Sequence, residues 1–333
     1  MYKTPLAYNR EKTAEIVPSM RWDGKENFGA WQDRGRSELT RLLGLPFKKC
    51  DAKFRVEYEK DQGDFIETRF DFQSEEGFFV PCHFLAPKNV SGKRPLVLCL
   101  MGHGTGMHIN LGRKKYPQDE EALKLVDRAI AIRAVKEGYC ALLKEQRCFG
   151  ELGGTEKGPD CTVSSMAALL IGRTTIGERV WDLQRVLDLA LENFPVIDKD
   201  KIICTGNSGG GTITFFASCL ESRISYSMPS CYFCSFDDCI GAMHHCACNF
   251  IPNIRLFFDM GDLAGLIAPR PLVIIAGRKD EIFPLPGVEK AFKEAQRMYS
   301  GAGASDKIKL TVGEEGHRYY ADLAWEAMNP FVR

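Results

Sequence analysis

Residues 201–211 read KIICTGNSGGG, a short apolar run that leads directly into a glycine cluster around Ser208. The run is typical of a buried strand, and a helix is expected to begin inside the cluster. A sharp turn between the two forces unfavourable backbone angles on the residue at its apex, so its neighbours must be small. We expect Gly206 and Gly210 to let the backbones pass, and Ser208 to stand clear at the carboxyl end of a sheet.

The sequence on both sides of this turn alternates between strand and helix patterns. Strands are expected at 54–60, 65–72, 78–86, 94–102, 139–144, 201–206, 224–230, 268–277 and 307–312, and helices at 119–138, 177–194, 285–300 and 321–328. The first three strands show period-two alternation and no intervening helix, which predicts an antiparallel edge. The later strand–helix units need crossover connections. The predicted fold class is therefore α/β, with a mostly parallel central sheet and helices on both faces.

The chain is expected to form one main domain. Residues 1–53 predict a lead-in with one helix, at 30–45, packed on that domain, and residues 54–333 predict the catalytic domain. Two long segments, 144–177 and 229–268, do not fit the alternation. Long loops in compact domains are usually functional. We therefore expect 229–268 to form a lid or a pocket wall.

Composition excludes several classes of protein. The 44 basic residues balance 44 acidic ones, which argues against a nucleic-acid binder and against a basic membrane-binding surface. The first 17 residues lack a signal-peptide core, and no stretch reaches membrane-spanning length. The 13 cysteines are scattered, many of them inside apolar runs, which fits a reducing compartment. These features predict a cytoplasmic protein.

An aspartate and then a histidine follow Ser208 in the sequence, each of them just after a predicted strand. Asp280 comes after the strand at 268–277, and His317 comes after the strand at 307–312. All three side chains should emerge at the same edge of a parallel sheet. A serine hydroxyl needs a base within hydrogen-bonding reach, and that base needs a carboxylate to orient it. We predict a catalytic triad of Ser208, Asp280 and His317.

Other residues compete for these roles. Asp280 could instead cap a turn, and Glu281 is the second choice for the acid. Asp259 and Asp262 precede their strand, so packing or capping is the expected role for them. His244 and His245 precede the acid, and could be core residues or line the pocket.

Acyl transfer also needs hydrogen-bond donors for the developing oxyanion. One is expected to be the backbone N–H of Gly209. The second should come from the loop after the strand at 94–102, where His103 and Gly104 would position the N–H of Thr105. The glycines do not complete a dinucleotide or phosphate-binding motif, and no cofactor is expected.

The stretches MGHGTG, EQRCFGELGG, GNSGGG, LIAPRPLVIIAGRKDEIFP and GHRYY occur in the order seen in α/β-hydrolase enzymes. Over most of residues 54–333 the chain resembles that superfamily, and more narrowly its bacterial acetylxylan esterase and dienelactone hydrolase-like branch. The resemblance implies a cofactor-free serine esterase that acts on carbohydrate acetyl esters. The EQRCFGE stretch keeps the branch's Arg147 and Gly150, but departs from its pattern at Cys148 and Glu151. We expect Arg147, Asn207, His244 and His245 to line the substrate pocket.

Residues 231–250 hold five cysteines and two histidines. The pairs Cys231/Cys234 and Cys246/Cys248 have spacings that zinc sites use. The segment is also rich in aromatic and aliphatic residues, where cysteine is more often a packing residue than a ligand. We therefore expect no metal here, and a role in shaping the pocket.

Three functional hypotheses follow. The first is an esterase that uses two acyl-transfer steps on a small-molecule or oligosaccharide ester. The second is an enzyme of the same fold that cleaves a different bond, namely a serine peptidase or a lactone hydrolase. The third is a non-catalytic or metal-binding protein on the same scaffold. Fold alone does not choose the substrate, and the oligomeric state is left open.

Overall fold

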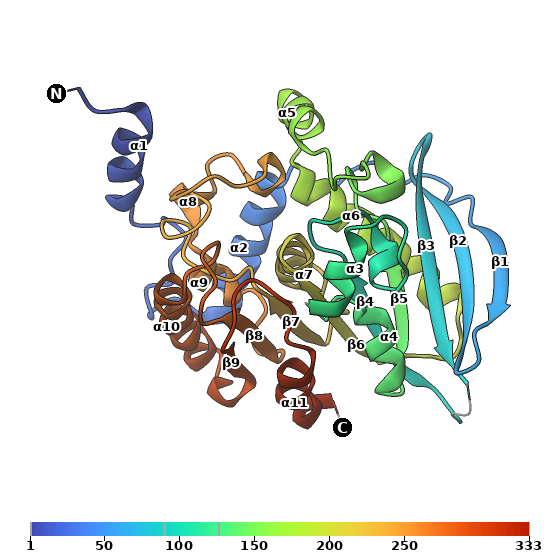
Figure 1. Cartoon of the computed structure of the whole chain (residues 1–333). Coiled ribbons are helices and arrows are strands. Elements are labelled where there is room, and N and C mark those ends of the chain that lie inside the picture. Colours follow the sequence, from blue (N-terminus) through green and yellow to red (C-terminus); the bar gives the residue numbers. More distant parts are fainter. Residues whose placement is uncertain (1, 89–90, 126, 333) are drawn as a thin grey trace.

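The computed structural model describes residues 2–88, 91–125 and 127–332, and a nine-stranded sheet forms its centre (Figure 1). The strands are β1 (Arg55–Asp61), β2 (Phe65–Glu75), β3 (Phe78–Pro87), β4 (Arg94–Leu100), β5 (Cys140–Lys144), β6 (Ile197–Asn207), β7 (Tyr226–Ser230), β8 (Leu272–Gly277) and β9 (Ile308–Gly313). The helices are α1 (Pro5–Ala14), α2 (Phe28–Leu42), α3 (Asp119–Leu125), α4 (Ile130–Lys136), α5 (Thr162–Leu170), α6 (Thr175–Asn193), α7 (Gly209–Leu220), α8 (Ile254–Phe257), α9 (Met260–Ala264), α10 (Leu285–Gly301) and α11 (Ala321–Val332).

The sheet contains both antiparallel and parallel strand pairs, as predicted. Its strand order is β1-β2-β3-β5-β4-β6-β7-β8-β9. The pairs β1–β2, β2–β3 and β3–β5 are antiparallel, and every pair from β5–β4 to β8–β9 is parallel. This confirms the predicted α/β class with an antiparallel N-terminal edge.

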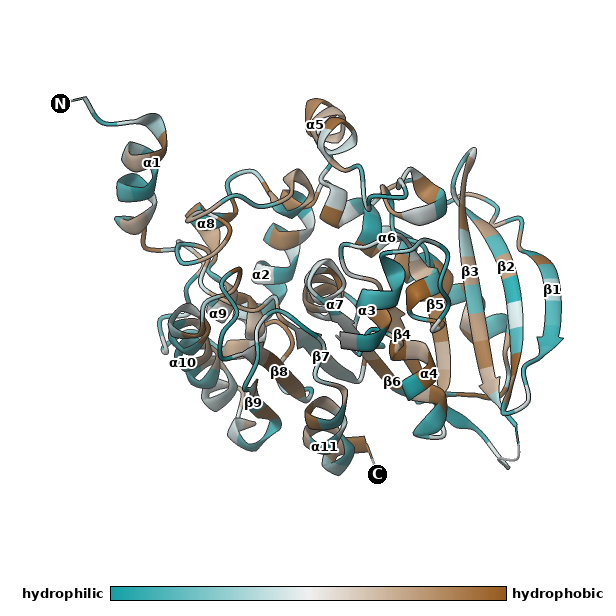
Figure 2. Ribbon diagram, viewed as in Figure 1, coloured by the Kyte–Doolittle hydropathy of each residue, from teal (hydrophilic) through white to brown (hydrophobic). Residues whose placement is uncertain are grey.

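Side chains of the central strands alternate between two cores. Leu96, Leu98 and Leu100 of β4 belong to a cluster that includes residues of α2, α6, α7, α9 and α10. Val97 and Cys99 point the other way and join a second cluster with α4 and α11. In Figure 2, β4 and β8 are accordingly largely hydrophobic, while β1 at the edge is largely hydrophilic. Burial on both faces is typical of parallel strands covered by helices.

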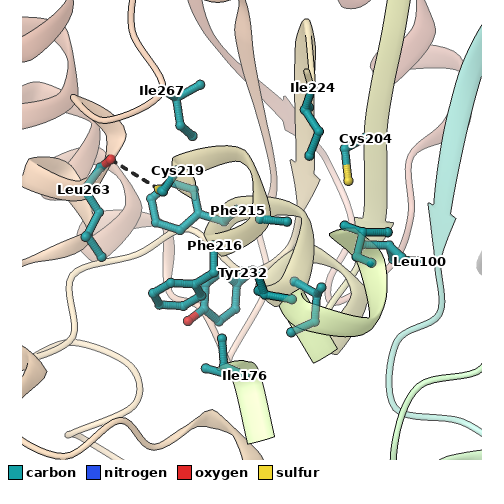
Figure 3. Close-up of a cluster of buried hydrophobic side chains, with 14 of the residues drawn as sticks. Leu100, Ile176, Cys204, Phe215, Phe216, Cys219, Ile224, Tyr232, Leu263 and Ile267 are labelled. Atoms are coloured by element: carbon teal, nitrogen blue, oxygen red, sulfur yellow. Dashed lines mark hydrogen bonds between the residues drawn. The ribbon is translucent and has the colours of Figure 1, made fainter. Parts of the chain in front are cut away.

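Helix α7 is held in the middle of the larger core (Figure 3). Phe215 and Phe216 both lie against Tyr232, with ring centroids 6.3 and 6.2 Å apart. The Cys219 thiol donates to the carbonyl oxygen of Leu263 at 3.4 Å. All of these side chains except that of Leu263 come from α7 or the segment just after β7. The helix that begins at the glycine cluster is therefore fixed by packing along its length.

The lead-in contributes to the same core through α2. The helix begins after Asn27, whose side chain accepts from the N–H of Ala30. Trp31 and Leu39 are buried in the main cluster. Gln32 donates to the carbonyl oxygens of Gly265 and Ala268, both at 2.7 Å. The helix α1 was not predicted, since one helix was expected in residues 1–53, and none of its side chains is buried.

Some elements differ from the sequence-based expectation. The helix predicted at 119–138 is two helices, α3 and α4. Asp127 lies between them with a φ of 50°, which a continuous helix does not allow; residue 126 lies outside the described residues. The long segments hold the unpredicted helices α5, α8 and α9. Asp259 and Asp262 form the capping box of α9, which is one of the two roles expected for them. No helix in the described ranges is long and apolar enough to cross a membrane.

Candidate active site

The turn at Ser208 has the strained backbone that the sequence predicts. Ser208 connects β6 to α7 with φ 57° and ψ −121°. Its N–H donates to the carbonyl oxygen of Ser230 at 2.9 Å. A Cβ at Gly206 or Gly210 would lie 2.5 or 2.1 Å from the carbonyl oxygen of Leu100, so only glycine fits at either position. The turn therefore presents the Ser208 side chain at the carboxyl end of the sheet.

Asp280 and His317 form a hydrogen-bonded pair at the same edge. The Nδ1 atom of His317 lies 2.8 Å from Oδ2 of Asp280. The other carboxylate oxygen accepts from the N–H groups of Ile282 and Phe283 at 2.9 and 3.1 Å. Burial raises the pKa of Asp280, but the hydrogen bond and charge of His317, together with these N–H donors, outweigh it and leave that pKa below its usual value. Asp280 is 4% exposed, whereas neighbouring Glu281 is exposed.

Ser208 and His317 meet at one cavity of about 310 Å³. Its lining consists of His103, Arg128, Ser208, Gly209, Thr212, His244, His245, Cys246, Asn249, Ile282, Phe283 and His317. The ring of Phe283 stacks on that of His317, with the ring centroids 5.8 Å apart. No hydrogen bond joins Ser208 to His317 within the described ranges. Such contacts are often long in a ligand-free site and tighten when substrate binds.

The loop after β4 lies over the first turn of α7. A Cβ built on Gly102 would lie 3.3 Å from Cβ of Ser208, and one built on Gly209 would lie 2.8 Å from Nδ1 of His103. Thr105, the predicted source of the second oxyanion donor, does not line the cavity. Its hydroxyl donates to Asp119 in a buried network that includes His108. The residue of this loop that reaches the cavity is His103.

Arg147 does not line the cavity, contrary to the sequence-based prediction. Its guanidinium is buried, with ion pairs to Asp182 and Glu75, each at 2.8 Å. It also lies over the ring of Phe78. The strand β2, which the EQRCFGE stretch faces, supplies Glu75, and α6 supplies Asp182. Arg147 therefore joins β2 to α6 through its ion pairs.

Of the other three residues predicted to line the pocket, two line the cavity and one, Asn207, does not. His244 and His245 line the cavity. Burial lowers the pKa of His245 to about 4, and the neighbouring histidines add to this shift. Asn207 is buried behind the turn, where its Oδ1 accepts from the hydroxyl of Ser230 at 3.0 Å, and it does not line the cavity.

The sequence reasoning missed Arg128 as a cavity residue. Arg128 falls inside the stretch predicted as one long helix, where it reads as an ordinary surface position. In the structure it precedes α4 and reaches the cavity, and its guanidinium donates to the carbonyl oxygen of His103 at 3.5 Å. Burial lowers the pKa of this guanidinium below its usual value. Only the break between α3 and α4 places it there.

Two groups of side chains could hold a metal ion within the described ranges. The first is His103, Cys161, Cys246 and Cys248, and the second is Cys231 with Asp280 and His317. The second group contains the predicted acid and base, and its Cys231 thiol donates to the carbonyl oxygen of Arg318. The first group was not predicted. Its members come from three distant segments, and only Cys246 and Cys248 are close to each other in the sequence.

A strained serine between β6 and α7, with an acid after β8 and a histidine after β9, defines the class of protein as an α/β-hydrolase. The chain belongs to the Abhydrolase family, whose model matches residues 12–311. YtaP of Bacillus subtilis, named as a hydrolase, is 26% identical over 298 residues, which cover 88% of this chain and 96% of YtaP.

Solved structures share the fold at low sequence identity. A Bacteroides fragilis protein named for acetyl xylan esterase activity superimposes with a TM-score of 0.77 at 18% identity, covering 97% of this chain and 84% of its own. A glucuronoyl esterase from Solibacter usitatus gives a TM-score of 0.71 at 14% identity, covering 96% and 98%. Both likenesses extend over nearly the whole chain and establish the common architecture.

Proposed function

We propose that this protein is a serine esterase that cleaves carboxylic esters of carbohydrates through a covalent acyl-enzyme. The observation that supports this most directly is the Asp280–His317 pair, 2.8 Å apart, at the cavity that Ser208 also lines. Asp280 accepts two further N–H groups through its second oxygen and keeps a lowered pKa. It is thus suited to remain ionised and hold His317 in one tautomer.

In the first half-reaction His317 takes the proton of Ser208 through Nε2, while its Nδ1–H donates to Asp280. The serine oxygen bonds to the ester carbon, and the carbonyl electrons move onto oxygen. The intermediate collapses, the alcohol leaves with the proton from His317, and the acyl group stays on Ser208. Water then attacks with the same base, releasing the carboxylic acid and returning the proton to Ser208.

The oxyanion needs two donors close to Ser208. Gly209 N–H is one, because it opens α7 and has no partner within that helix. For the second we favour the backbone N–H of His103 over that of Thr105. His103 lies against Gly209 and lines the cavity, and Thr105 does neither.

The size and polarity of the cavity support a small acyl group on a polar alcohol. Its volume of about 310 Å³ is at the lower end for ligand pockets. Its lining includes the polar or charged side chains of Arg128, Thr212, Asn249, His244 and His245. A long acyl chain would desolvate these groups without bonding to them. A short acyl group on a sugar hydroxyl fits both constraints, which favours acetyl esters.

Ester hydrolysis by the Ser208→Ala variant tests the proposal. Activity on a short acyl ester should fall by about four to six orders of magnitude, and a fluorophosphonate should label wild type at Ser208 and leave the variant unlabelled. Ser222→Ala is a matched control because Ser222 is exposed near the far end of α7. Near-wild-type hydrolysis by Ser208→Ala, or labelling at another residue, would contradict the assignment.

A substrate panel tests the substrate class separately. We expect acetylated xylo-oligosaccharides to be hydrolysed with a higher kcat/KM than a methyl ester of glucuronic acid, a lactone or an aminoacyl amide. Preference for the uronic acid ester would mean that the ester bond of the substrate is formed by the carboxyl group of the sugar and not by one of its hydroxyl groups. Preference for the lactone or the amide would establish the lactonase or peptidase alternative.

The cysteines support a reducing compartment and hence a cytoplasmic location. All 13 are free, and most of them are buried. Counting thiols in protein isolated without reductant tests this: we expect all of them to be alkylated after denaturation, and a substantial deficit would argue for an oxidising compartment.

A further inference from the structure

Three loops at the rim of the cavity bring a histidine and three cysteines together. His103 comes from the loop after β4, Cys161 from the residue that caps α5, and Cys246 and Cys248 from the segment between β7 and α8. One ligand atom from each of the four lies within 4.8 Å of the other three. Nε2 of His103 is 3.2 Å from Sγ of Cys248, and the sulfur atoms of Cys246 and Cys248 are 3.4 Å apart.

These separations are close to those of a tetrahedral zinc site. With Zn–S bonds of about 2.3 Å and a Zn–N bond of about 2.0 Å, the ligand atoms of a tetrahedron lie about 3.5 to 3.8 Å apart. The contacts of 3.2 and 3.4 Å lie just below that range, and every other separation is at most 4.8 Å, so small side-chain rotations would suffice to close the site. Three cysteines and one histidine form one of the usual ligand sets of structural zinc, and four protein ligands leave no open position.

The surroundings carry a charge suited to a thiolate cluster. Arg179 of α6 is 1% exposed, and no carboxylate pairs with it among the residues that the structure describes. Its guanidinium donates to Sγ of Cys161 at 3.5 Å and to the carbonyl oxygen of Arg147 at 2.7 Å, and lies over the ring of Phe149. A buried cation needs an anionic partner. Three thiolates and one Zn²⁺ carry a net charge of −1, which Arg179 would balance.

We propose that His103, Cys161, Cys246 and Cys248 bind one Zn²⁺ ion as a closed structural site beside the active centre. The ion would join the oxyanion loop to both long segments of the chain, 144–177 and 229–268. Coordination through Nε2 of His103 would leave the proton on Nδ1, the atom that faces Gly209. The ion itself would take no part in ester cleavage, because its four positions are filled.

The proposed zinc ligands differ from the cysteine pairs that the local spacing in the sequence suggests. Cys231 and Cys234 do not join the site. The thiol of Cys231 donates to Arg318, and that of Cys234 lies 3.8 Å from the carbonyl oxygen of Pro284. The partners of Cys246 and Cys248 come instead from residues 85 or more positions earlier in the chain. A disulfide between Cys246 and Cys248 is the chemical alternative, and the experiment must separate the two.

The first measurement is the metal content of untagged full-length protein purified without chelator, by elemental mass spectrometry. We expect about one zinc per chain. Cys161→Ser, Cys246→Ser and Cys248→Ser should each lose most of it. Cys219→Ser should retain it, because Cys219 is buried in the core, where its thiol donates to the carbonyl oxygen of Leu263. Zinc that survives in all three variants, or equal loss in Cys219→Ser, would overturn the proposal.

A second measurement keeps the test decisive if the variants fail to fold. Wild-type protein is stripped with a chelator under reducing conditions and titrated with Co²⁺. One equivalent should produce the visible bands of tetrahedral cobalt and a thiolate-to-cobalt charge-transfer band, and should raise the thermal midpoint of unfolding. Absence of these bands would overturn the proposal, as would a Cys246–Cys248 disulfide found by peptide mapping of the untreated protein. Neither readout depends on esterase activity.

Discussion

The imidazole of His103 lies against Gly209, the residue that follows the proposed nucleophile. A Cβ built at position 209 would come within 2.8 Å of Nδ1 and 2.9 Å of Cε1 of that ring. The backbone at Gly209 is not in the left-handed region, so glycine is needed there because of this contact and not because of its φ. The close approach lets the loop after β4 reach the start of α7.

Gly209→Ala should therefore damage catalysis more than folding. The added methyl group would push His103 and its loop away from the oxyanion site, and we expect kcat to fall by about a hundredfold, the scale of losing one oxyanion donor. Gly29→Ala is the control, because its Cβ would meet only Asn27 Oδ1, at 3.3 Å, at the start of α2. Steady-state kinetics with a short acyl ester measures the effect, and equal rates for both variants would argue against a role for this contact.

Asp280→Asn should leave the site assembled but hold His317 in the wrong tautomer. The amide can still accept the N–H groups of Ile282 and Phe283 through its oxygen, but its NH₂ group would then face Nδ1 of His317. A loss of about 10⁴-fold in kcat is expected by analogy with other triads. Glu281→Gln, one residue later and exposed, should keep wild-type kcat. The reverse order of effects would make Glu281 the acid.

Arg128→Met tests the cavity cation. Arg128 lines the cavity and has no carboxylate partner in the described ranges. Hydrogen bonds to a charged group contribute about 1.5 to 3 kcal/mol, so KM for a sugar ester should rise about tenfold or more. KM for a small aryl acetate should change little. Arg278→Met, whose side chain is exposed and paired with Glu314, is the control. A uniform change in KM for both substrates would argue for a general disturbance of the loop.

Glu145 should make stability depend on pH. Burial raises the pKa of this carboxyl group to about 7, although the N–H groups of Met107 and Glu151 partly oppose the shift. A raised pKa in the folded state means that the contribution to stability is full below about pH 4.5 and is lost as pH rises through about 7. Glu145→Gln, which cannot ionise, should flatten the dependence of the unfolding midpoint between pH 5 and pH 8.

The control for that measurement is Glu156→Gln, since Glu156 is exposed. Its unfolding midpoint should follow the wild-type curve across the same pH range. If the Glu145→Gln curve also follows wild type, burial of the carboxyl group does not govern the pH dependence.

The local sequence pattern was sufficient to predict the fold and to predict that Ser208, Asp280 and His317 lie at the same edge of the sheet. The turn at Ser208 and the loops holding Asp280 and His317 each follow a strand whose apolar run is evident in the sequence. Parallel strands then bring their carboxyl ends to one edge, which needs no knowledge of side-chain packing. The division of the chain at residue 53 remains a prediction.

Contacts between distant loops could not be derived in this way. Arg147 looks like a pocket residue until β2 and α6 provide Glu75 and Asp182 for it. Cys161 and His103 are 58 positions apart, and nothing local joins either of them to Cys246. Their meeting depends on how two long segments lie over the sheet, and that is decided by packing, not by periodicity.

The φ of 57° and ψ of −121° at Ser208 have a consequence for engineering this protein. A residue whose backbone is held in so sparsely populated a conformation lowers the stability of the fold by on the order of 1 to 3 kcal/mol, and packing around α7 must offset this strain. Ser208→Gly would relieve that strain and should melt at a higher temperature than wild type while being inert. A library screened for heat resistance alone would therefore enrich chains that have lost the nucleophile, and selection must be made on turnover as well.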